Sequence, residues 1–271
     1  MVSVSGDFFQ FRSGELKRVD ISLSDSLTVA DSWLVSKGHA RALERHFHRF
    51  ASSIADQKTR KQLPAFFAAL VGQTPKEGEW FPRIEYRESQ PVGERLFLRM
   101  RPAPERTETC TLWTSDKSDP RVAFEVKGPD LSSCQALRRA ANLHGADEAV
   151  ILSPSGNIAD GALSSIVWWR GDVLYGPDGS TDWLPSITRE LVFEIAGQAG
   201  FQTMEDAVAP ENLEGCEVWS LSALQGIRGV TSWGEIPLGE LRMQRSFVKR
   251  LSMLNQELPT PDEIFESFGD L

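Results

Sequence analysis

The sequence predicts an α+β protein built from two domains. The chain has 271 residues, a length that suits one large domain or two modest ones. Segments with strand-like and helix-like patterns are mixed along it. They are interrupted at Arg101-Pro-Ala-Pro-Glu-Arg, because two prolines within three residues fit neither a helix interior nor a sheet. We therefore expect a small N-terminal domain over residues 1–101, a linker over 102–107 and a larger domain over 108–271.

The N-terminal half is expected to hold short strands and two helices. Alternation of apolar and polar residues between Phe8 and Val19 suggests short strands. Apolar residues at spacings of three and four predict a helix over 39–54, and residues 58–71 have the pattern of a second amphipathic helix. Residues 83–88 and 95–100 have the pattern of strands.

The C-terminal half shows stronger signals. Its predicted strands cover 109–114, 121–126, 148–152, 165–169, 173–175 and 217–220. Its predicted helices cover 132–144, 188–199 and 238–256, and the first two end at the glycines Gly145 and Gly200. Residues 259–271 contain four acids and no base, so this tail is expected to be a solvated end.

Composition restricts the class of protein. Hydrophobic residues make up 41% of the chain, enough for a core, and the net charge of -9 argues against a nucleic-acid partner, which needs a basic face. The three cysteines form no CxxC pair, and the four histidines lack metal-site spacing, so neither a disulfide framework nor a bound metal is indicated. No signal peptide or apolar run of about 20 residues is present. We expect a cytoplasmic protein without a membrane partner.

Three features of the second half combine into one kind of chemistry. Lys127 follows an apolar run and precedes Gly-Pro, Asp160 precedes a glycine between two predicted strands, and Leu184-Pro-Ser-Ile-Thr-Arg opens a helix. Each alone is ordinary: a solvated lysine, a turn aspartate and a capped helix. Together they are the parts that a pyridoxal 5'-phosphate (PLP) site needs. A lysine forms an imine, a carboxylate faces the pyridine nitrogen, and a helix start binds the phosphate.

The same residues resemble the class IV aminotransferase family, also called fold type IV PLP enzymes. The resemblance runs from about Asp31 to Val230. Its motifs, in order, are His46-Phe-His-Arg-Phe, Lys127 ahead of Gly145-Ala-Asp-Glu-Ala, Val150-Ile-Leu-Ser-Pro-Ser-Gly-Asn-Ile-Ala-Asp-Gly, Leu184-Pro-Ser-Ile-Thr-Arg and Ser222-Ala-Leu-Gln-Gly-Ile-Arg-Gly-Val. The family includes branched-chain aminotransferases, D-amino acid aminotransferases and aminodeoxychorismate lyases. It implies a small N-terminal α/β domain, a larger domain with a barrel-like β core, PLP in the interdomain cleft, and a homodimer.

The resemblance also assigns roles. Lys127 would be the catalytic residue, forming the Schiff base with PLP and moving the proton at the substrate's α carbon. The phosphate would be bound by Arg49, by Ile187 and Thr188 at the helix start, and by Ser222 on the late loop. Asp160 would lie beside the pyridine nitrogen and favour its protonated form.

Two positions depart from the family pattern. Asp160 stands where the family has a glutamate, which keeps the charge but shortens the side chain by one methylene. Ser186 stands where the family has a glycine, so the turn that binds the phosphate is expected to differ slightly.

The reaction itself stays open at this stage. Aminotransfer between an amino acid and a keto acid is the family-level expectation, and aminodeoxychorismate lyase, which releases pyruvate and 4-aminobenzoate, is the close alternative. A protein that keeps the PLP fold only for binding is a third. Candidate residues for the substrate carboxylate are Arg99, Arg101 and Arg228.

Overall fold

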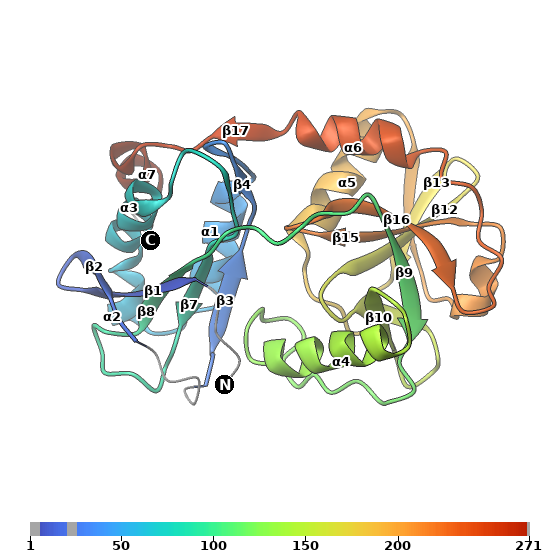
Figure 1. Cartoon of the computed structure of the whole chain (residues 1–271), viewed down its shortest axis with the longest axis horizontal. Coiled ribbons are helices and arrows are strands. Elements are labelled where there is room, and N and C mark those ends of the chain that lie inside the picture. Colours follow the sequence, from blue (N-terminus) through green and yellow to red (C-terminus); the bar gives the residue numbers. More distant parts are fainter. Residues whose placement is uncertain (1–5, 21–25, 270–271) are drawn as a thin grey trace. The chain divides into compact units, whose positions relative to one another are not determined.

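The computed structural model describes residues 6–20 and 26–269, and it divides the chain into two compact units. The first unit comprises the chain up to Glu105, the short segment Val126–Pro129 and the chain from Leu254 onward; the second comprises Arg106–Glu125 and Asp130–Met253. Lys127 and the C-terminal residues therefore belong to the first unit, whereas the sequence had suggested the larger domain. Figure 1 shows helices and strands in both units, and the α+β class is confirmed.

The first unit is built on an antiparallel five-stranded sheet. In sheet order its strands are β2 (Glu15–Arg18), β1 (Asp7–Arg12), β8 (Leu96–Met100), β7 (Arg83–Tyr86) and β3 (Val29–Ser32). A smaller sheet consists of β17 (Asn255–Glu257), β5 (His39–Arg41), β4 (Val35–Ser36) and β6 (Glu79–Trp80). Through β17 the C-terminal segment pairs with β5, near the start of the chain.

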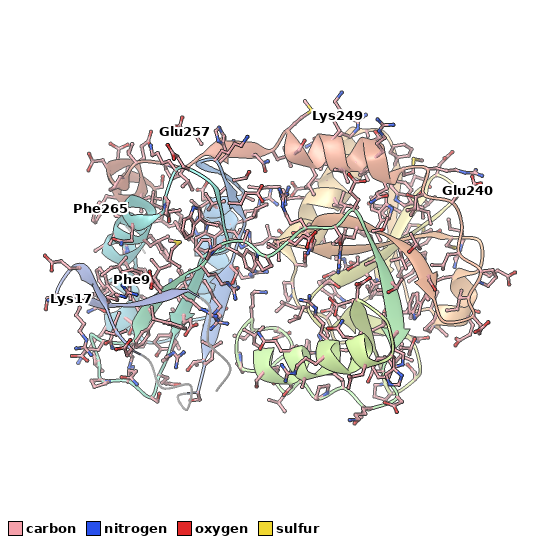
Figure 2. The ribbon with its side chains drawn as sticks, in the orientation of Figure 1. Phe9, Lys17, Glu240, Lys249, Glu257 and Phe265 are labelled. Carbon is pink, nitrogen blue, oxygen red and sulfur yellow. The ribbon has the colours of Figure 1, made fainter. Side chains whose placement is uncertain are left out.

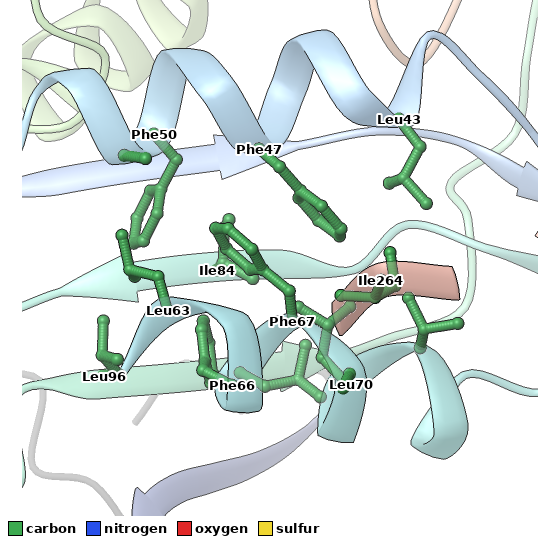
Figure 3. Close-up of a cluster of buried hydrophobic side chains, with 14 of the residues drawn as sticks. Leu43, Phe47, Phe50, Leu63, Phe66, Phe67, Leu70, Ile84, Leu96 and Ile264 are labelled. Carbon is green, nitrogen blue, oxygen red and sulfur yellow. The ribbon is translucent and has the colours of Figure 1, made fainter. Parts of the chain in front are cut away.

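Helices cover one face of the five-stranded sheet. They are α1 (Leu43–Ser52), α2 (Gln57–Arg60), α3 (Leu63–Gln73) and α7 (Pro261–Phe268). Figure 3 shows Phe47 and Phe50 of α1 pointing toward α3, which carries Phe66 and Phe67, with Ile84 of the sheet between the two helices. The rings of Phe47 and Phe67 are stacked 4.1 Å apart. Because this apolar layer buries one face of α1, the polar side chains of the helix lie on its other faces.

The sequence predicts a solvated C-terminal tail, and this prediction is wrong. Thr260 caps α7 by accepting a hydrogen bond from the Glu263 N–H, and the Glu263 carboxylate in turn accepts from the Thr260 N–H. Two apolar residues of α7, Ile264 and Phe268, are 3% and 2% exposed. Phe268 lies edge-on to both Phe47 and Phe67, so the tail completes the core of the first unit.

The second unit is built on a mixed eight-stranded sheet. In sheet order its strands are β11 (Ile158–Gly161), β10 (Glu148–Leu152), β9 (Thr109–Thr114), β16 (Gly226–Trp233), β15 (Glu217–Ser222), β12 (Ser165–Arg170), β13 (Val173–Pro177) and β14 (Gln202–Asp206). The sheet curls, so that the edge strand β11 contacts β12 and β13 (Figure 1). The expected barrel-like β core is confirmed.

Both faces of this sheet are covered. Helices α4 (Leu131–Leu143), α5 (Ile187–Gln198) and α6 (Gln244–Ser252), with the short 3-10 helix η1 (Pro210–Leu213), accompany the strands. Trp168 and Trp169 are successive residues of β12 and point to opposite faces. Trp168 stacks on Tyr175, and Trp169 lies edge-on to Phe247 of α6, so each tryptophan has its own core.

Two predicted elements in the second half are wrong. Residues 121–126 form turns and bends instead of a strand, because the Asp130 carboxylate accepts hydrogen bonds from the Val122 and Ala123 N–H groups and folds the segment back. The helix predicted over 238–256 is confined to Gln244–Ser252 and is followed by β17.

The packing of α7 gives a direct test of the tail's role. We expect Phe268→Ala to lower the free energy of unfolding by about 3 kcal/mol, because it empties a fully packed aromatic site. Phe265 lies on the same helix but is 49% exposed (Figure 2), so Phe265→Ala should change stability by less than about 0.5 kcal/mol. Urea unfolding followed by circular dichroism measures both. Equal effects of the two substitutions would contradict the docking of α7.

Candidate active site

A buried polar cluster in the first unit joins β3 to α1. Asp31 on β3 is fully buried, and His46 and Arg49 lie three residues apart on one face of α1. Arg49 Nε donates to Asp31 Oδ2 and Arg49 Nη2 to Asp31 Oδ1, each at 2.8 Å. His46 Nδ1 lies 2.8 Å from Asp31 Oδ1. Two side chains of α1 are thus held by one carboxylate of β3.

The charges in this cluster follow from burial and pairing. Burial alone would raise the pKa of Asp31, but the Arg49 guanidinium and His46 together lower it well below its usual range, so Asp31 is ionised. Burial lowers the pKa of His46, with Arg49 and Lys127 acting in the same direction, so His46 is neutral at pH 7 and donates from Nδ1. The effect of Lys127 on the pKa of His46 indicates that the lysine lies near this cluster.

The Lys127 segment is held against β3. The Ala30 N–H donates to the Lys127 carbonyl at 2.7 Å. Gly128 has φ +145°, and a Cβ atom there would lie 2.8 Å from both Ala30 N and Val29 Cα. Only glycine therefore allows this close approach of the two backbones. Lys127 follows a turn, not the end of a strand, yet its backbone position is fixed by Gly128 and β3.

A second buried carboxylate lies in the other unit. Asp160 is on β11, within the strand instead of in a turn between strands, and is 4% exposed. Its Oδ2 accepts from Arg121 Nη1 at 3.2 Å and from the Leu184 N–H at 3.0 Å; its Oδ1 accepts from the Gly161 N–H at 3.1 Å. Asp119 holds Arg121 in turn, accepting from Nη2 at 2.7 Å.

Burial raises the pKa of Asp160 to about 6, with Arg121 and the two backbone N–H groups opposing that rise. The carboxyl is therefore mostly ionised at pH 7 and close to its midpoint in mildly acidic solution. A buried carboxylate poised near neutrality is typical of a functional site.

The segment after Leu184 leads into α5, which starts at Ile187. Ser186 caps this helix by accepting from the Arg189 N–H at 3.3 Å, with φ -95°. The replacement of the family's glycine by Ser186 thus brings no backbone strain. Thr188 is buried in the first turn, where N–H groups without intrahelical partners favour an anion.

Arg189 fixes the loop before α5. Its guanidinium lies 3.9 Å from the centre of the Trp183 ring and donates to the Pro177 carbonyl and to Glu205, each at 2.8 Å. Because Leu184 is also bonded to Asp160, both ends of the Trp183–Ser186 segment are held. The Asp160 carboxylate and the start of α5 therefore keep a fixed relation within one unit.

The remaining predicted site residues lie elsewhere in their units. Ser222 ends β15, and its hydroxyl accepts from the Gln225 N–H at 3.1 Å. Arg228 on β16 is buried; its Nη2 donates to Ser220 Oγ at 3.4 Å, while its Nε has no hydrogen-bond partner among the described residues. Both of these hydrogen bonds lie within the hairpin of β15 and β16, and neither reaches Asp160.

Arg99 and Arg101 lie on the other face of the first unit's sheet from Asp31. Asp31 is opposite Ile84, which is opposite Leu98, and the neighbouring residue Arg99 points the other way. Arg99 lies over the Phe8 ring. Burial, helped by the charges of Arg83 and Arg99, lowers the pKa of Arg101 to about 10. The structure thus separates these arginines from Arg49.

Two residues that pair with the candidate site residues were not found from the sequence. Asp31 and Arg121 were not singled out, although an aspartate inside the apolar run Val29-Ala-Asp-Ser-Trp is a signal of a buried ion pair. Among the described residues, no group of three or more His, Cys, Asp or Glu side chains could hold a metal ion, and no helix there is long and apolar enough to cross a membrane.

Comparison with known protein families agrees with these motifs. The model of the family described as amino-transferase class IV matches residues 28–233. Branched-chain-amino-acid aminotransferase of Escherichia coli (strain K12) is 30% identical over 122 residues, 45% of this chain and 39% of that protein. Aminodeoxychorismate lyase of Bacillus subtilis (strain 168) is 23% identical over 124 residues, 45% of this chain and 42% of that protein. The matches thus span about two-fifths of either relative.

Solved structures extend the likeness to most of the chain. A hypothetical aminotransferase of Mycobacterium tuberculosis, in its alpha-ketoglutarate and PMP bound form, has a TM-score of 0.76 at 19% identity, covering 92% of this chain and 98% of that chain. At this identity the likeness shows the fold, and it confirms the expected fold type IV architecture.

The ion pair at Asp160 can be tested without any ligand. The Arg121 cation stabilises the ionised form of the Asp160 carboxyl, so its removal favours the protonated form. We therefore expect Arg121→Met to raise the Asp160 pKa by about one unit. Arg121→Lys keeps the charge and should stay near the wild-type value. A pH titration of ¹³C-labelled aspartate carboxyls by NMR measures this, with Asp160→Asn identifying the resonance. An unchanged pKa in Arg121→Met would contradict the assigned pairing.

Proposed function

The chain belongs to the amino-transferase class IV family, and from this premise we propose that it is a PLP-dependent enzyme that transfers the amino group of an amino acid to a keto acid. Lys127 is the proposed catalytic residue. The observation that carries the proposal is the hydrogen bond of Leu184 to Asp160, which ties a buried, ionisable carboxylate to the start of α5. PLP needs an acid at its ring nitrogen and an anion site at its phosphate, at a constant separation.

The residues present fit PLP chemically. Arg49 supplies a guanidinium cation that suits a phosphate, and Ile187 and Thr188 supply N–H groups at a helix start. Asp160 supplies a buried carboxylate. Ser222 is a further proposed phosphate ligand. Arg49 and Lys127 belong to the first unit, and the other proposed ligands belong to the second. When bound, PLP supplies an electron sink that makes the substrate's α proton removable.

Lys127 has two proposed tasks. Its amine would hold PLP when the cofactor is bound, and the same group would move the proton at the substrate's α carbon. The Ala30–Lys127 backbone bond and the close packing of Gly128 support this role, because they fix the position from which the long side chain extends.

Asp160 is proposed to stabilise a proton on the ring nitrogen. Arg121 and the Leu184 N–H orient Oδ2, and the Gly161 N–H orients Oδ1. Arg121 also keeps the carboxyl ionised in a buried position, which it needs in order to act as a counter-ion. Asp160 thus has a fixed orientation and stays ionised, and this supports an active enzyme over a protein that keeps the fold only for binding.

Aminodeoxychorismate lyase activity is the second candidate. Its support is the similarity to the Bacillus subtilis lyase, which covers 45% of this chain. Both reactions need the same acid, phosphate site and lysine. They differ in whether the amino group is passed to a keto acid or a bond in the substrate side chain is broken with release of pyruvate.

Substrate binding and assembly are further parts of the proposal. Arg99, Arg101 and Arg228 are proposed for the substrate carboxylate. The buried Arg228 Nε, without a partner among the described residues, supports a polar ligand there. A homodimer working in the cytoplasm is proposed from the family, and sedimentation measures the dimer.

The proposal predicts a clear outcome in an activity assay. Protein reconstituted with PLP should transfer amino groups from branched-chain or other amino acids to 2-oxoglutarate, and Lys127→Ala should lose at least about a thousandfold of that rate. Lys61→Ala, at an exposed lysine, should keep it. Mass spectrometry of products also detects 4-aminobenzoate from aminodeoxychorismate. Formation of 4-aminobenzoate without amino transfer would replace the first candidate with the second, and neither activity in the reconstituted protein would contradict both.

A further inference from the structure

The Asp31 carboxylate accepts four hydrogen bonds, three of them at one oxygen. Its Oδ1 receives the Ser32 N–H at 2.7 Å, His46 Nδ1 at 2.8 Å and Arg49 Nη2 at 2.8 Å, while Oδ2 receives Arg49 Nε at 2.8 Å. Two of these bonds form a bidentate carboxylate–guanidinium pair, which fixes both the distance and the plane of the guanidinium. The carboxylate itself is fixed by its place on a fully buried strand.

This pairing commits one edge of the Arg49 guanidinium. Nε–H and one N–H of Nη2 donate to Asp31, so a phosphate would be met by the terminal edge that Nη1 and the second N–H of Nη2 form. The Arg49 side chain is 17% exposed, compared with 0% for Asp31. Asp31 thus lies on the buried side of the guanidinium and sets the angle at which the outer side is presented.

Two effects of Asp31 on a bound phosphate oppose one another. Its negative charge offsets the charge of Arg49, because His46 is neutral, and this weakens attraction for an anion. Its bidentate bond holds the guanidinium in one orientation, and this strengthens binding by removing side-chain freedom before the ligand arrives. The two effects predict opposite signs for the removal of the charge, so experiment can separate them.

The same strand that carries Asp31 also holds the lysine segment. Ala30, the residue before Asp31, donates its N–H to the Lys127 carbonyl. β3 therefore fixes the Arg49 guanidinium through a side chain and the Lys127 backbone through a main-chain bond, one residue apart. A cofactor attached to Lys127 and anchored at its phosphate needs such a constant separation.

From these contacts we propose that Asp31 is a positioning residue, which orients Arg49 toward the cofactor phosphate and outweighs the loss of positive charge that it causes. This inference rests on the proposed function, in which Arg49 is a phosphate ligand. His46 supports the arrangement by donating its Nδ1 proton to the same carboxylate.

The test uses two ligands that differ only in the phosphate. Calorimetric titration of the cofactor-free protein with pyridoxamine 5'-phosphate and with pyridoxamine separates the phosphate contribution from the rest, and neither compound has an aldehyde to react with lysines. We expect Asp31→Asn to weaken pyridoxamine 5'-phosphate binding by about tenfold and to change pyridoxamine binding by less than about twofold. Thermal unfolding reports whether each variant is folded.

Two further variants exclude a purely structural effect. Asp56→Asn breaks another aspartate–arginine pair of the same unit, at 3.0 Å from Arg95, and should leave both affinities unchanged. Arg49→Lys keeps the charge but loses the fork. If Asp31 acts through Arg49, adding Asp31→Asn to Arg49→Lys should cause less than about a twofold further loss.

The possible outcomes are distinct. Tighter or unchanged binding of the phosphate ligand by Asp31→Asn contradicts the inference, as does an equal loss for both ligands or a full tenfold loss on the Arg49→Lys background. If wild type does not distinguish the two ligands, or Arg49→Lys binds both as wild type does, the phosphate role of Arg49 in the proposed function fails first. A selective loss that Arg49→Lys abolishes supports the inference.

Discussion

A buried carboxylate must be compensated by hydrogen-bond donors or a cation, and this constraint organises both units of the protein. Asp31 is paired with Arg49 and His46, and Asp160 with Arg121 and two backbone N–H groups. Each pairing draws together segments that are distant in sequence: β3 with α1 in one unit, and β11 with the loops at Arg121 and Leu184 in the other. Arg49 belongs to the first of these networks and Asp160 to the second, and both are proposed to bind PLP.

The regular parts of the fold could be predicted from local pattern. The strand predicted over 109–114 is β9, with the same bounds, and the helix predicted over 132–144 differs from α4 by one residue at each end. Both have apolar periodicity that matches the covered face, and the second ends at Gly145 with φ +76°. The predictions failed where a side chain overrides periodicity, as when Asp130 bonds to the N–H groups of Val122 and Ala123. Thr260 and Glu263 have the spacing of a capping box, which predicts a helix start. The tail was instead interpreted from its four acids alone.

The candidate site was accessible from sequence only as separate motifs. Lys127, Arg49, Asp160 and Thr188 were named because their order resembles a family, and that family is confirmed. Their individual roles stay predictions. The residues that set charge and orientation, Asp31 and Arg121, could not be found this way, because pairing across 18 or 39 residues depends on tertiary structure. Ser186 departs from the family's glycine in the phosphate motif, but it caps α5 without backbone strain.

The proposed attachment of PLP to Lys127 is tested most directly by chemical labelling. The protein is mixed with PLP, reduced with borohydride and digested, and the pyridoxyl group is located by mass spectrometry. The account predicts labelling concentrated on the peptide that contains Lys127, and its loss in Lys127→Ala while Lys61→Ala is labelled like wild type. Labelling spread over surface lysines without preference for Lys127, or equal labelling of the Lys127→Ala protein, would contradict it.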